Sequence, residues 1–456
     1  MIHHDRIRLL NDKGLAERSF VLYWMQRSQR AECNHALEYA VRQANLLLKP
    51  LVVFFGVTGD FPEANERHYR FMLEGLKETR EALEKRNILM VIGNVSPEAG
   101  ALELSASAAL VVTDRGCLRI ERAWREALGR EASCRVVQVE TDAVVPVQTV
   151  SSKEEYAAAT LRPKIHRLLD TYTVPLHEEE VHFSSLGLSL PFARLDIRDV
   201  DAALKLINMD RSVKPVQTRG GTSRAKLLLQ DFITSKLPQY PALKNDPGLD
   251  VSSGLSPYLH FGQISPLYVA LALRDAPVEP REDFLEELLV RRELAMNFAL
   301  FNNHYDSFDA LPAWAKATLD KHRADKRPYQ YSPEELENSR THDPYWNAAQ
   351  TEMVLSAKMN GYMRMYWGKK LLEWGRTPEE AFRTALFLNN RWSLDGRDPN
   401  GFAGIAWCFG KHDRPWKERE IFGMVRYMNA GGLDRKFDMK RYLEKVRRLG
   451  SSHLSV

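Results

Sequence analysis

Short apolar runs alternate with amphipathic stretches over residues 19–140. The runs, rich in β-branched and aromatic residues, lie at 19–25, 50–56, 88–93, 108–114 and 134–139. Stretches between them, such as 31–48 and 67–86, space apolar residues three and four apart and carry charges on the other face. This alternation is typical of a parallel sheet covered by helices on both faces. We therefore predict a doubly wound, Rossmann-like α/β domain over residues 16–145.

A ligand of such a domain is expected outside the carboxyl ends of the strands. The polar residues that could gather there are Gln26, Arg27, Arg30, Asp60 and Arg115.

The pattern changes after residue 146. Residues 146–205 contain several prolines and irregular polar stretches, which predict a long linker with one short helix. Beyond it the β-rich runs disappear, and helical periodicity recurs at 222–237, 264–275, 282–301, 333–338, 346–374, 378–391 and 415–428. We therefore predict an all-helical second domain over residues 206–450.

Composition narrows the class of protein. Hydrophobic residues make up 44% of the 456 residues and charged residues 27%, which excludes a disordered chain. Four scattered cysteines predict a reducing compartment and neither a disulfide framework nor a metal site. No apolar run approaches the roughly 20 residues that span a bilayer. We expect a cytoplasmic protein without a membrane anchor.

Charge and tryptophan are unevenly distributed. The net charge is only +4, but residues 401–456 carry twelve Lys/Arg and six Asp/Glu. Seven of the nine tryptophans fall between residues 314 and 416. The C-terminal part of the helical domain is therefore where we expect unusual chemistry.

Glu287 lies in an apolar helical stretch, 284–298. Its spacing from Arg291 suits an ordinary surface ion pair. A partly desolvated Glu287 carboxyl could instead donate a hydrogen bond to a substrate carbonyl. Both interpretations remain open from the spacing.

The stretch 343–374 is dense in Met, Trp and Tyr. Trp367 and Trp374 are seven residues apart, so on one helix they share a face. Core packing is the plain interpretation of such a stripe. A relay of oxidisable indoles is the functional one.

Turn signals and basic residues mark 388–420. Asp395 and Arg397 flank Gly396 and could bind a ring-edge amide or a ribose, with Arg364 as partner of Asp395; ordinary turn chemistry is the alternative. Between 407 and 419 basic and aromatic residues interleave, as phosphate contact with base stacking requires, although a solvated helix start would look similar. The Ser/Gly turn at 252–256 could bind a phosphate.

Together these segments resemble the photolyase/cryptochrome family, and more narrowly the class II cyclobutane pyrimidine dimer photolyases. The resemblance runs from VLYWMQRSQRAECNHALEYA (21–40) through SPYLHFGQISPL (256–267), ELLVRRELAMNF (287–298), HDPYWNAAQ (342–350), GYMRMYWGKK (361–370) and LDGRDPNGFAG (394–404) to FGKHDRPWKERE (409–420). One departure is Val290, where other photolyase classes carry a tryptophan.

The resemblance implies an enzyme, a carbon–carbon lyase that repairs UV-damaged DNA in light. Excited, reduced FAD would donate an electron to a flipped-out pyrimidine dimer. The residues that it places around FAD are Tyr240, Ser252, Ser253, Gly254, Leu255, Ser256, Arg291, Arg364, Asn389, Asp395, Gly396 and Arg397.

The resemblance also assigns the remaining roles. Asn389 would face the flavin and Glu287 would hydrogen-bond the dimer. The tryptophan chain would run from Trp367 through Trp346 to Trp374. DNA contacts would come from Met365, Trp407, Lys411, Arg414 and Trp416.

An antenna pigment, best guessed as an 8-hydroxy-5-deazaflavin, would bind the first domain. The expected partner is damaged DNA, single- or double-stranded, and the protein is expected to be a monomer, associated with the nucleoid if prokaryotic. The alternatives are a cryptochrome-like blue-light receptor and a helical DNA-binding protein without flavin. Cryptochromes often carry a long C-terminal extension, whereas this sequence ends soon after the basic helical stretch. This difference favours the enzyme.

Overall fold

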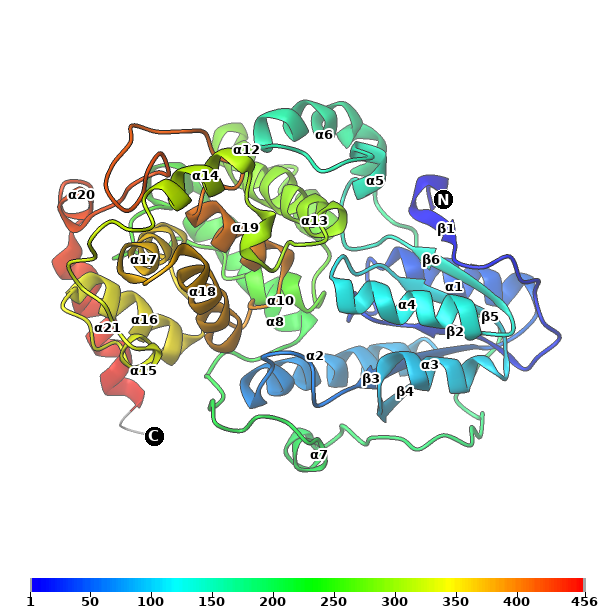
Figure 1. Ribbon diagram of the computed structural model, residues 1–456. Coiled ribbons are helices and arrows are strands. Elements are labelled where there is room, and N and C mark those ends of the chain that lie inside the picture. The colour runs from blue at the N-terminus through cyan, green and yellow to red at the C-terminus, as the bar shows by residue number, and fades with distance from the viewer. Residues whose placement is uncertain (1, 454–456) are drawn as a thin grey trace.

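A six-stranded sheet forms the core of the N-terminal part of the computed structural model, which describes residues 2–453 (Figure 1). The strand order is β1-β6-β5-β2-β3-β4, and all neighbours are parallel except β1 and β6. The strands are β1 (Ile7–Leu9), β2 (Phe20–Trp24), β3 (Leu51–Val57), β4 (Leu89–Asn94), β5 (Ala108–Asp114) and β6 (Arg135–Val139). All five predicted strands are confirmed. The pattern missed only β1, a three-residue, half-exposed edge strand that precedes the predicted domain start at residue 16.

Helices cover both faces of this sheet. The helices here are η1 (His4–Arg6), α1 (His35–Leu46), α2 (Glu66–Lys85), α3 (Pro97–Ser105) and α4 (Arg119–Glu131). Alternate residues of β2 divide between the faces: Val21 and Tyr23 pack with α1 and α2, while Leu22 and Trp24 pack with α3 and α4. The predicted doubly wound α/β fold is confirmed.

The connecting segment 146–205 is more ordered than a linker with one short helix. It contains α5 (Val147–Val150), α6 (Ala158–Tyr172) and α7 (Val200–Leu206). Its extended part lies along the α/β domain (Figure 1), where Phe192 packs on Phe54 with ring centroids 5.4 Å apart. Leu195 and Ile197 join the buried cluster of the sheet. The segment folds without regular secondary structure at these residues, so their burial depends on docking against the sheet, which the sequence pattern did not predict.

The rest of the described chain is helical. Its elements are α8 (Thr222–Asp231), η2 (Phe232–Lys236), η3 (Leu237–Gln239), α9 (Tyr240–Leu243), α10 (Ser256–His260), α11 (Pro266–Ala272), α12 (Val278–Leu285), η4 (Glu286–Arg291), α13 (Arg292–Phe301), η5 (Phe308–Ala310), α14 (Ala313–Lys321), α15 (Pro333–Glu337), α16 (Pro344–Ser356), α17 (Gly361–Trp374), α18 (Pro378–Trp392), α19 (Pro399–Cys408), α20 (Ala430–Asp434) and α21 (Met439–His453). Among the described helices, none is both long and apolar enough to cross a membrane.

Two helical predictions are wrong. Residues 415–428 form no helix; the segment is irregular, with a bridge between Arg419 and Gly423. Its apolar residues Phe422 and Val425 are buried against neighbouring elements, so they mimic a helical stripe without forming one. The predicted helix 346–374 is broken after α16 because Ala357 adopts a left-handed conformation, with φ of 57°.

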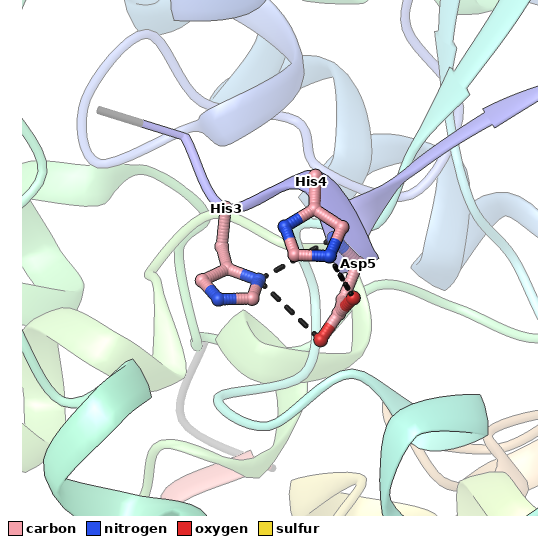
Figure 2. A group of neighbouring side chains, drawn as sticks. All are labelled: His3, His4 and Asp5. Carbon is pink, nitrogen blue, oxygen red and sulfur yellow. Dashed lines mark hydrogen bonds and ion pairs between the residues drawn. The ribbon is translucent and has the colours of Figure 1, made fainter.

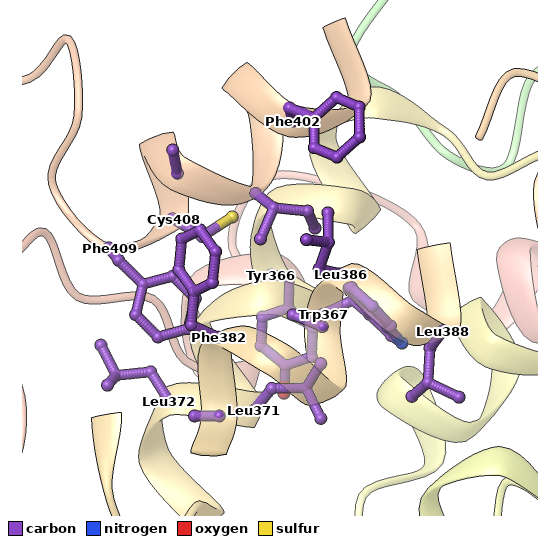
Figure 3. Packing of buried hydrophobic residues seen from close by; sticks show 14 of the residues in the cluster. Tyr366, Trp367, Leu371, Leu372, Phe382, Leu386, Leu388, Phe402, Cys408 and Phe409 are labelled. Carbon is purple, nitrogen blue, oxygen red and sulfur yellow. The ribbon is translucent and has the colours of Figure 1, made fainter. Parts of the chain in front are cut away.

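The helix α17 lies inside the helical domain and has almost no solvated face. Its Tyr366 and Trp367 pack among Phe382 of α18, Phe402 of α19 and the neighbouring Phe409 (Figure 3). Burial on most sides explains why the Met/aromatic stretch lacks the polar positions of a surface helix. It also places the tryptophans in a rigid, water-poor environment.

Candidate functional site

Four side chains from three separate segments meet in the helical domain. Arg364 of α17 donates to Asn389 Oδ1 of α18 at 3.2 Å and lies 3.6 Å from Asp395 Oδ1. Asp395 also accepts a hydrogen bond from Ser256 Oγ at the start of α10. Asn389 is fully buried, and the Arg364 and Asp395 side chains are about one-fifth exposed. The structure thus brings together four residues from three segments that are widely separated in the sequence.

Two glycines let the backbone approach this cluster closely. A Cβ on Gly396 would lie 2.7 Å from the carbonyl oxygen of Asn390, and one on Gly401 would lie 3.0 Å from Asn389 Nδ2. In the serine turn, Gly254 has φ of 69°, which favours glycine. Ser253 Oγ accepts from the backbone N–H of Leu255, and Ser252 lies beside Asp250. The turn is therefore preformed immediately before Ser256.

The residues present fit a flavin. Asp395 Oδ1 is buried and lacks a hydrogen-bond donor among the described residues. A carboxylate oxygen, a guanidinium and a buried amide on one surface match a ring edge that carries both donors and acceptors. The hydroxyls of the serine turn, close to that surface through Ser256, suit a phosphate.

Glu287 lies beside Tyr240, another predicted cofactor contact. Lys244 Nζ lies 3.5 Å from Glu287 Oε1 and 5.4 Å from the centre of the Tyr240 ring. Burial raises the pKa of Tyr240, and the Glu287 carboxylate raises it further. The ring packs edge-on against Phe232 and Phe284. Glu287 itself is half-exposed, so it is available to a ligand.

The expected ion pair between Glu287 and Arg291 does not form. Residues 286–291 adopt a π-helix, in which residues five apart face each other, and Arg291 Nε instead binds Glu286 Oε1 at 3.0 Å. Arg291 is half-exposed, on the side of Glu286 and Arg162. The structure does not bring Arg291 to the cluster of Asp395, so its prediction as a cofactor contact gains no support.

Arg397 also points elsewhere. Its Nη1 donates to the carbonyl oxygen of Asn390 at 2.7 Å and lies 3.1 Å from Nε2 of His68 in the α/β domain. Burial lowers its pKa to about 10. The guanidinium therefore lies at the contact between the two domains, two residues beyond Asp395.

The three predicted relay tryptophans form a continuous chain. The rings of Trp367 and Trp346 stack with centroids 6.2 Å apart and planes 7° apart, and Trp374 lies 5.4 Å beyond Trp346. All three are buried. Trp346 Nε1 donates to the carbonyl oxygen of Trp367, and Trp367 Nε1 donates to Gln350. Trp346 thus lies between Trp367 and Trp374 in space, in the order that the family resemblance implies.

Cations and indoles alternate from the core to the surface near Trp407. Lys369 Nζ lies 5.0 Å from the centre of the Trp407 ring, Arg426 lies 5.6 Å from Trp407 and 4.9 Å from Trp416, and Arg414 lies 5.0 Å from Trp416. Lys369 is fully buried, whereas Trp416 is 38% exposed. Such stacking holds each ring in a fixed plane. Met365 is half-buried on the neighbouring helix α17.

Lys411 does not lie on this surface. It is buried, and its Nζ binds the Glu154 carboxylate and the carbonyl oxygen of Ala310. Its ammonium also lies 4.9 Å from the Phe298 ring. The prediction that Lys411 contacts DNA phosphates is corrected: the charge is used to join the segment after α5 to the helical domain.

A cavity lies at the carboxyl ends of β2 and β3, where the α/β domain meets the helical domain. Of the residues predicted there, Gln26 and Arg27 line it. The α/β domain also contributes Phe55, Tyr69, Glu121 and Trp124, and the helical domain contributes His260, Phe261 and Arg397. The cavity is mostly apolar with a few charged groups, as ligand pockets commonly are.

The other three residues predicted at this edge do not line the cavity. Arg30 is buried and donates to the carbonyl oxygens of Gly262 and Thr141. Arg115 is paired with Glu140, and Asp60 with Thr58. Buried arginines that bind backbone carbonyls cannot be told from ligand-binding arginines by their position after a strand.

A charged connection between the domains was not predicted from the sequence. Arg27 Nη2 lies 2.9 Å from Asp398 Oδ2, and His260 Nδ1 lies 3.0 Å from the same oxygen. Arg27 and His260 hold the pKa of Asp398 far below its usual range, although burial opposes them. Because the partners are more than 100 residues apart, no spacing in the sequence indicates the contact.

Within the described residues, one group could offer three ligand atoms to a metal ion: His3, His4 and Asp5 (Figure 2). His4 Nε2 lies 2.9 Å and His3 Nδ1 3.4 Å from the Asp5 carboxylate, which also accepts from the Tyr172 hydroxyl at 2.6 Å. The His4 side chain is 87% exposed. These groups already bind one another, at the edge of the α/β domain.

The sequence is similar to that of known photolyases. The DNA photolyase family model matches residues 21–181. A deoxyribodipyrimidine photo-lyase from Methanothermobacter thermautotrophicus is 50% identical over 450 residues, covering 98% of this chain and 99% of its own.

Solved structures share the fold at low identity. An archaeal photolyase from Sulfolobus tokodaii with two FAD molecules superposes with a TM-score of 0.70 at 16% identity, over 93% of this chain and 89% of that one. A cryptochrome from Synechocystis reaches 0.72 at 15% identity, over 93% and 88%. Identity of 50% over nearly the full length of both chains is decisive: this chain belongs to the photolyase/cryptochrome family.

Proposed function

We propose that this protein repairs cyclobutane pyrimidine dimers in UV-damaged DNA, using light and a bound FAD, as a class II photolyase and carbon–carbon lyase. The observation that carries the proposal is the surface formed by Ser256, Arg364, Asn389 and Asp395, with Glu287 and Trp407 as candidate dimer contacts. The near full-length relative named deoxyribodipyrimidine photo-lyase supports the same reaction.

A bound, reduced FAD would supply the electron that splits the cyclobutane ring when light excites it. The protein binds and orients. Arg364, Asp395 and Asn389 hold the ring edge, and the turn at 252–256 holds the phosphates. Because Asn389 is buried and its amide is already held by Arg364, it presents a fixed dipole to the cofactor.

The substrate is a dimer flipped out of the duplex. Photolyases are among the enzymes that extrude their target base, and damaged pairing lowers the cost of doing so. Trp407, which is half-buried and lies near Lys369 and Arg426, is the candidate apolar wall for the dimer, and Met365 offers a second contact. As a carboxylic acid, Glu287 would donate a hydrogen bond to the base carbonyls. Its side chain is half-exposed, and Lys244 is its one ion-pair partner among the described residues.

An antenna pigment would bind the cavity between the domains. Its apolar lining suits a flat ring, and Arg27, Glu121 and Arg397 suit polar groups on the rim of that ring. The pigment of this proposal is a deazaflavin. Extraction of the purified protein and identification of its pigments by mass spectrometry tests this assignment.

Repair itself is tested by illuminating the reduced protein with an oligonucleotide that contains one thymine dimer. We expect the intact thymines to reappear in light and not in the dark. A protein that absorbs as a flavoprotein but leaves the dimer unchanged would point to the light-receptor alternative instead. A protein with no flavin absorbance would contradict both.

A further inference from the structure

Beyond Trp374 the chain of aromatic contacts continues to a tyrosine with its own proton acceptor. The Tyr331 ring meets the Trp374 ring edge-on, with centroids 5.1 Å apart. The Tyr331 hydroxyl is hydrogen-bonded to Nδ1 of His342, and the backbone N–H of His342 donates to the same oxygen at 3.1 Å. His342 itself lies 5.6 Å from Trp374.

We propose that Tyr331 is the terminal electron donor of the tryptophan chain and that His342 takes its proton. The proposal rests on the relay in the proposed function. When Trp374 has lost one electron, Tyr331 returns one to it, and the phenol proton moves to His342 Nδ1. The products are an intact Trp374, a neutral Tyr331 phenoxyl radical and a His342 imidazolium.

Oxidation of a phenol at neutral pH requires a proton acceptor, because the phenol becomes a very strong acid once it has lost an electron. A neutral imidazole nitrogen is the side-chain acceptor best suited to this pH range. Burial raises the pKa of Tyr331, so the side chain is a neutral phenol that still holds its proton. The hydrogen bond to His342 therefore supplies what the oxidation step needs.

The surroundings of Trp374 favour passing the oxidation on. Trp374 Nε1 is buried and has no hydrogen-bond partner among the side chains and backbone of the described residues. The Lys370 ammonium lies 5.9 Å from the Trp374 ring, and its positive charge disfavours a second positive charge there. Glu373, paired with Lys370 at 2.8 Å, offsets part of this effect.

Solvent can reach the end of this row of aromatic side chains. Tyr331 is half-buried and lines a surface hollow with Trp374, Arg376 and Glu380. His342 is exposed, so the proton it accepts can leave to water. A soluble one-electron reductant, such as a thiol, can restore Tyr331 from the hollow and return the chain to its starting state.

The test compares Tyr331→Phe and His342→Gln with Tyr329→Phe as the matched control. Tyr329 stacks on His342 at 3.6 Å and is 47% exposed, but it makes no described ring contact with Trp374. After a light flash on the flavin-loaded protein, transient absorption follows the tryptophan radical and electron paramagnetic resonance follows the tyrosyl radical. Ring-deuterated tyrosine identifies the latter.

In the unaltered protein and in Tyr329→Phe, we expect the tryptophan radical to give way to a tyrosyl radical, more slowly in heavy water. Tyr331→Phe should abolish the tyrosyl radical and lengthen the life of the tryptophan radical. His342→Gln should slow the transfer by about a hundredfold, since positioned proton acceptors contribute about that much. A tyrosyl radical that persists in Tyr331→Phe, or none in the unaltered protein, overturns the proposal.

Failure of the relay is distinguishable from failure of this step. If light produces no tryptophan radical at all, the relay is wrong. Azide radicals, generated by pulse radiolysis, then oxidise tryptophans of the flavin-free protein directly. The tryptophan radical should then convert to a tyrosyl radical. Loss of this conversion in both Trp374→Phe and Tyr331→Phe supports the electron step, whereas conversion that Tyr331→Phe leaves unchanged contradicts it.

Discussion

Glu287 owes its surroundings to a single π-helical segment. In a regular α-helix it would pair with Arg291, four residues on. In η4 the extra residue per turn shifts Arg291 onto Glu286, and Glu287 keeps only Lys244 among the described partners. Such π-bulges occur often at functional sites. The local helix type therefore decides which of two adjacent carboxylates is free for a substrate.

We expect Glu287→Ala to lower the rate of dimer splitting by about tenfold or more, since a hydrogen bond to a charged group contributes about 1.5–3 kcal/mol. Binding of the dimer-containing oligonucleotide should fall much less. Single-turnover repair and fluorescence anisotropy measure the two effects. Glu286→Ala is the control, because Glu286 is occupied by Arg162 and Arg291. Equal loss in both variants would refute the role of Glu287.

Lys369 is a buried ammonium under the Trp407 ring. Its Nζ donates to the carbonyl oxygen of Cys408 at 2.5 Å. Burial lowers the pKa of Lys369 to about 8, although the nearby Cys408 and Asp413 oppose the shift. The unfolded chain therefore binds one more proton than the folded protein between about pH 8 and pH 10.5, and folding is favoured as the pH rises through this range.

The free energy of unfolding should thus rise between pH 8 and pH 10.5 by up to about 1.4 kcal/mol per pH unit from this residue. In Lys369→Met this contribution disappears. Urea unfolding of both proteins across this pH range gives the difference between their free energies of unfolding. Tyrosines and cysteines that both proteins share titrate in both, so their contribution cancels in this difference. Parallel pH profiles would show that Lys369 keeps its ordinary pKa.

At the scale of elements, α19 joins the two domains through its N-cap residue, Asp398. Asp398 caps this helix by accepting from the backbone N–H of Asn400 at 2.9 Å, and the same carboxylate binds Arg27 and His260. The helix carries Trp407 near its other end. A contact made by the α/β domain is therefore transmitted to the proposed dimer-binding wall by a rigid helix.

Asp398→Ala should destabilise the protein by about 3–5 kcal/mol, because it removes one partner from a buried pair. Asp398→Asn keeps the helix cap, which contributes about 1 kcal/mol, so its free energy of unfolding should fall by about that much less than in Asp398→Ala. Thermal unfolding measures both. Asp199→Asn is the control, since Asp199 caps α7 in an exposed position. A loss at Asp398 no larger than at Asp199 would contradict the interdomain role.

The elements differ in how well the sequence predicted them. Strands such as β3 and β5 are buried at every position and largely apolar, and their ends were predicted within one residue. The segment 415–428 has apolar residues at helical spacing but folds irregularly, because Gly423 turns with φ of 51° against Thr318. Periodicity reports burial, and burial does not require a helix.

At the scale of the whole molecule, the excess of positive charge in residues 401–456 is divided between surface and interior. Arg414 is exposed beside Trp416, whereas Lys411 is buried against Glu154. Arg435, Lys440 and Arg447 are exposed at or near the C-terminal helix α21. Only exposed cations can contact DNA phosphates and release the counter-ions bound there.

We expect Arg414→Gln to weaken DNA binding and to reduce the slope of log affinity against log salt by about 0.9, the value of one phosphate contact on a duplex. Lys411→Gln should leave that slope unchanged, since its charge is already neutralised inside the protein. Titrations at several salt concentrations give the slopes. A change for Lys411 as large as that for Arg414 would contradict the placement of these two residues.

The sequence by itself determined the α/β sheet and the helical second half, because these follow from local periodicity. It also determined the family, through motifs spread over the whole chain. The order of the three tryptophans was implied only by the family resemblance, and the contacts between their rings depend on the packing of α16 against α17. Only the tertiary structure decided which charges are free. The burial of Lys411 and the meeting of Tyr331 with Trp374 depend on packing between distant segments, which no local pattern records. The pairing of Arg291 with Glu286 depends on a π-helical turn, which the helical periodicity of the sequence does not show.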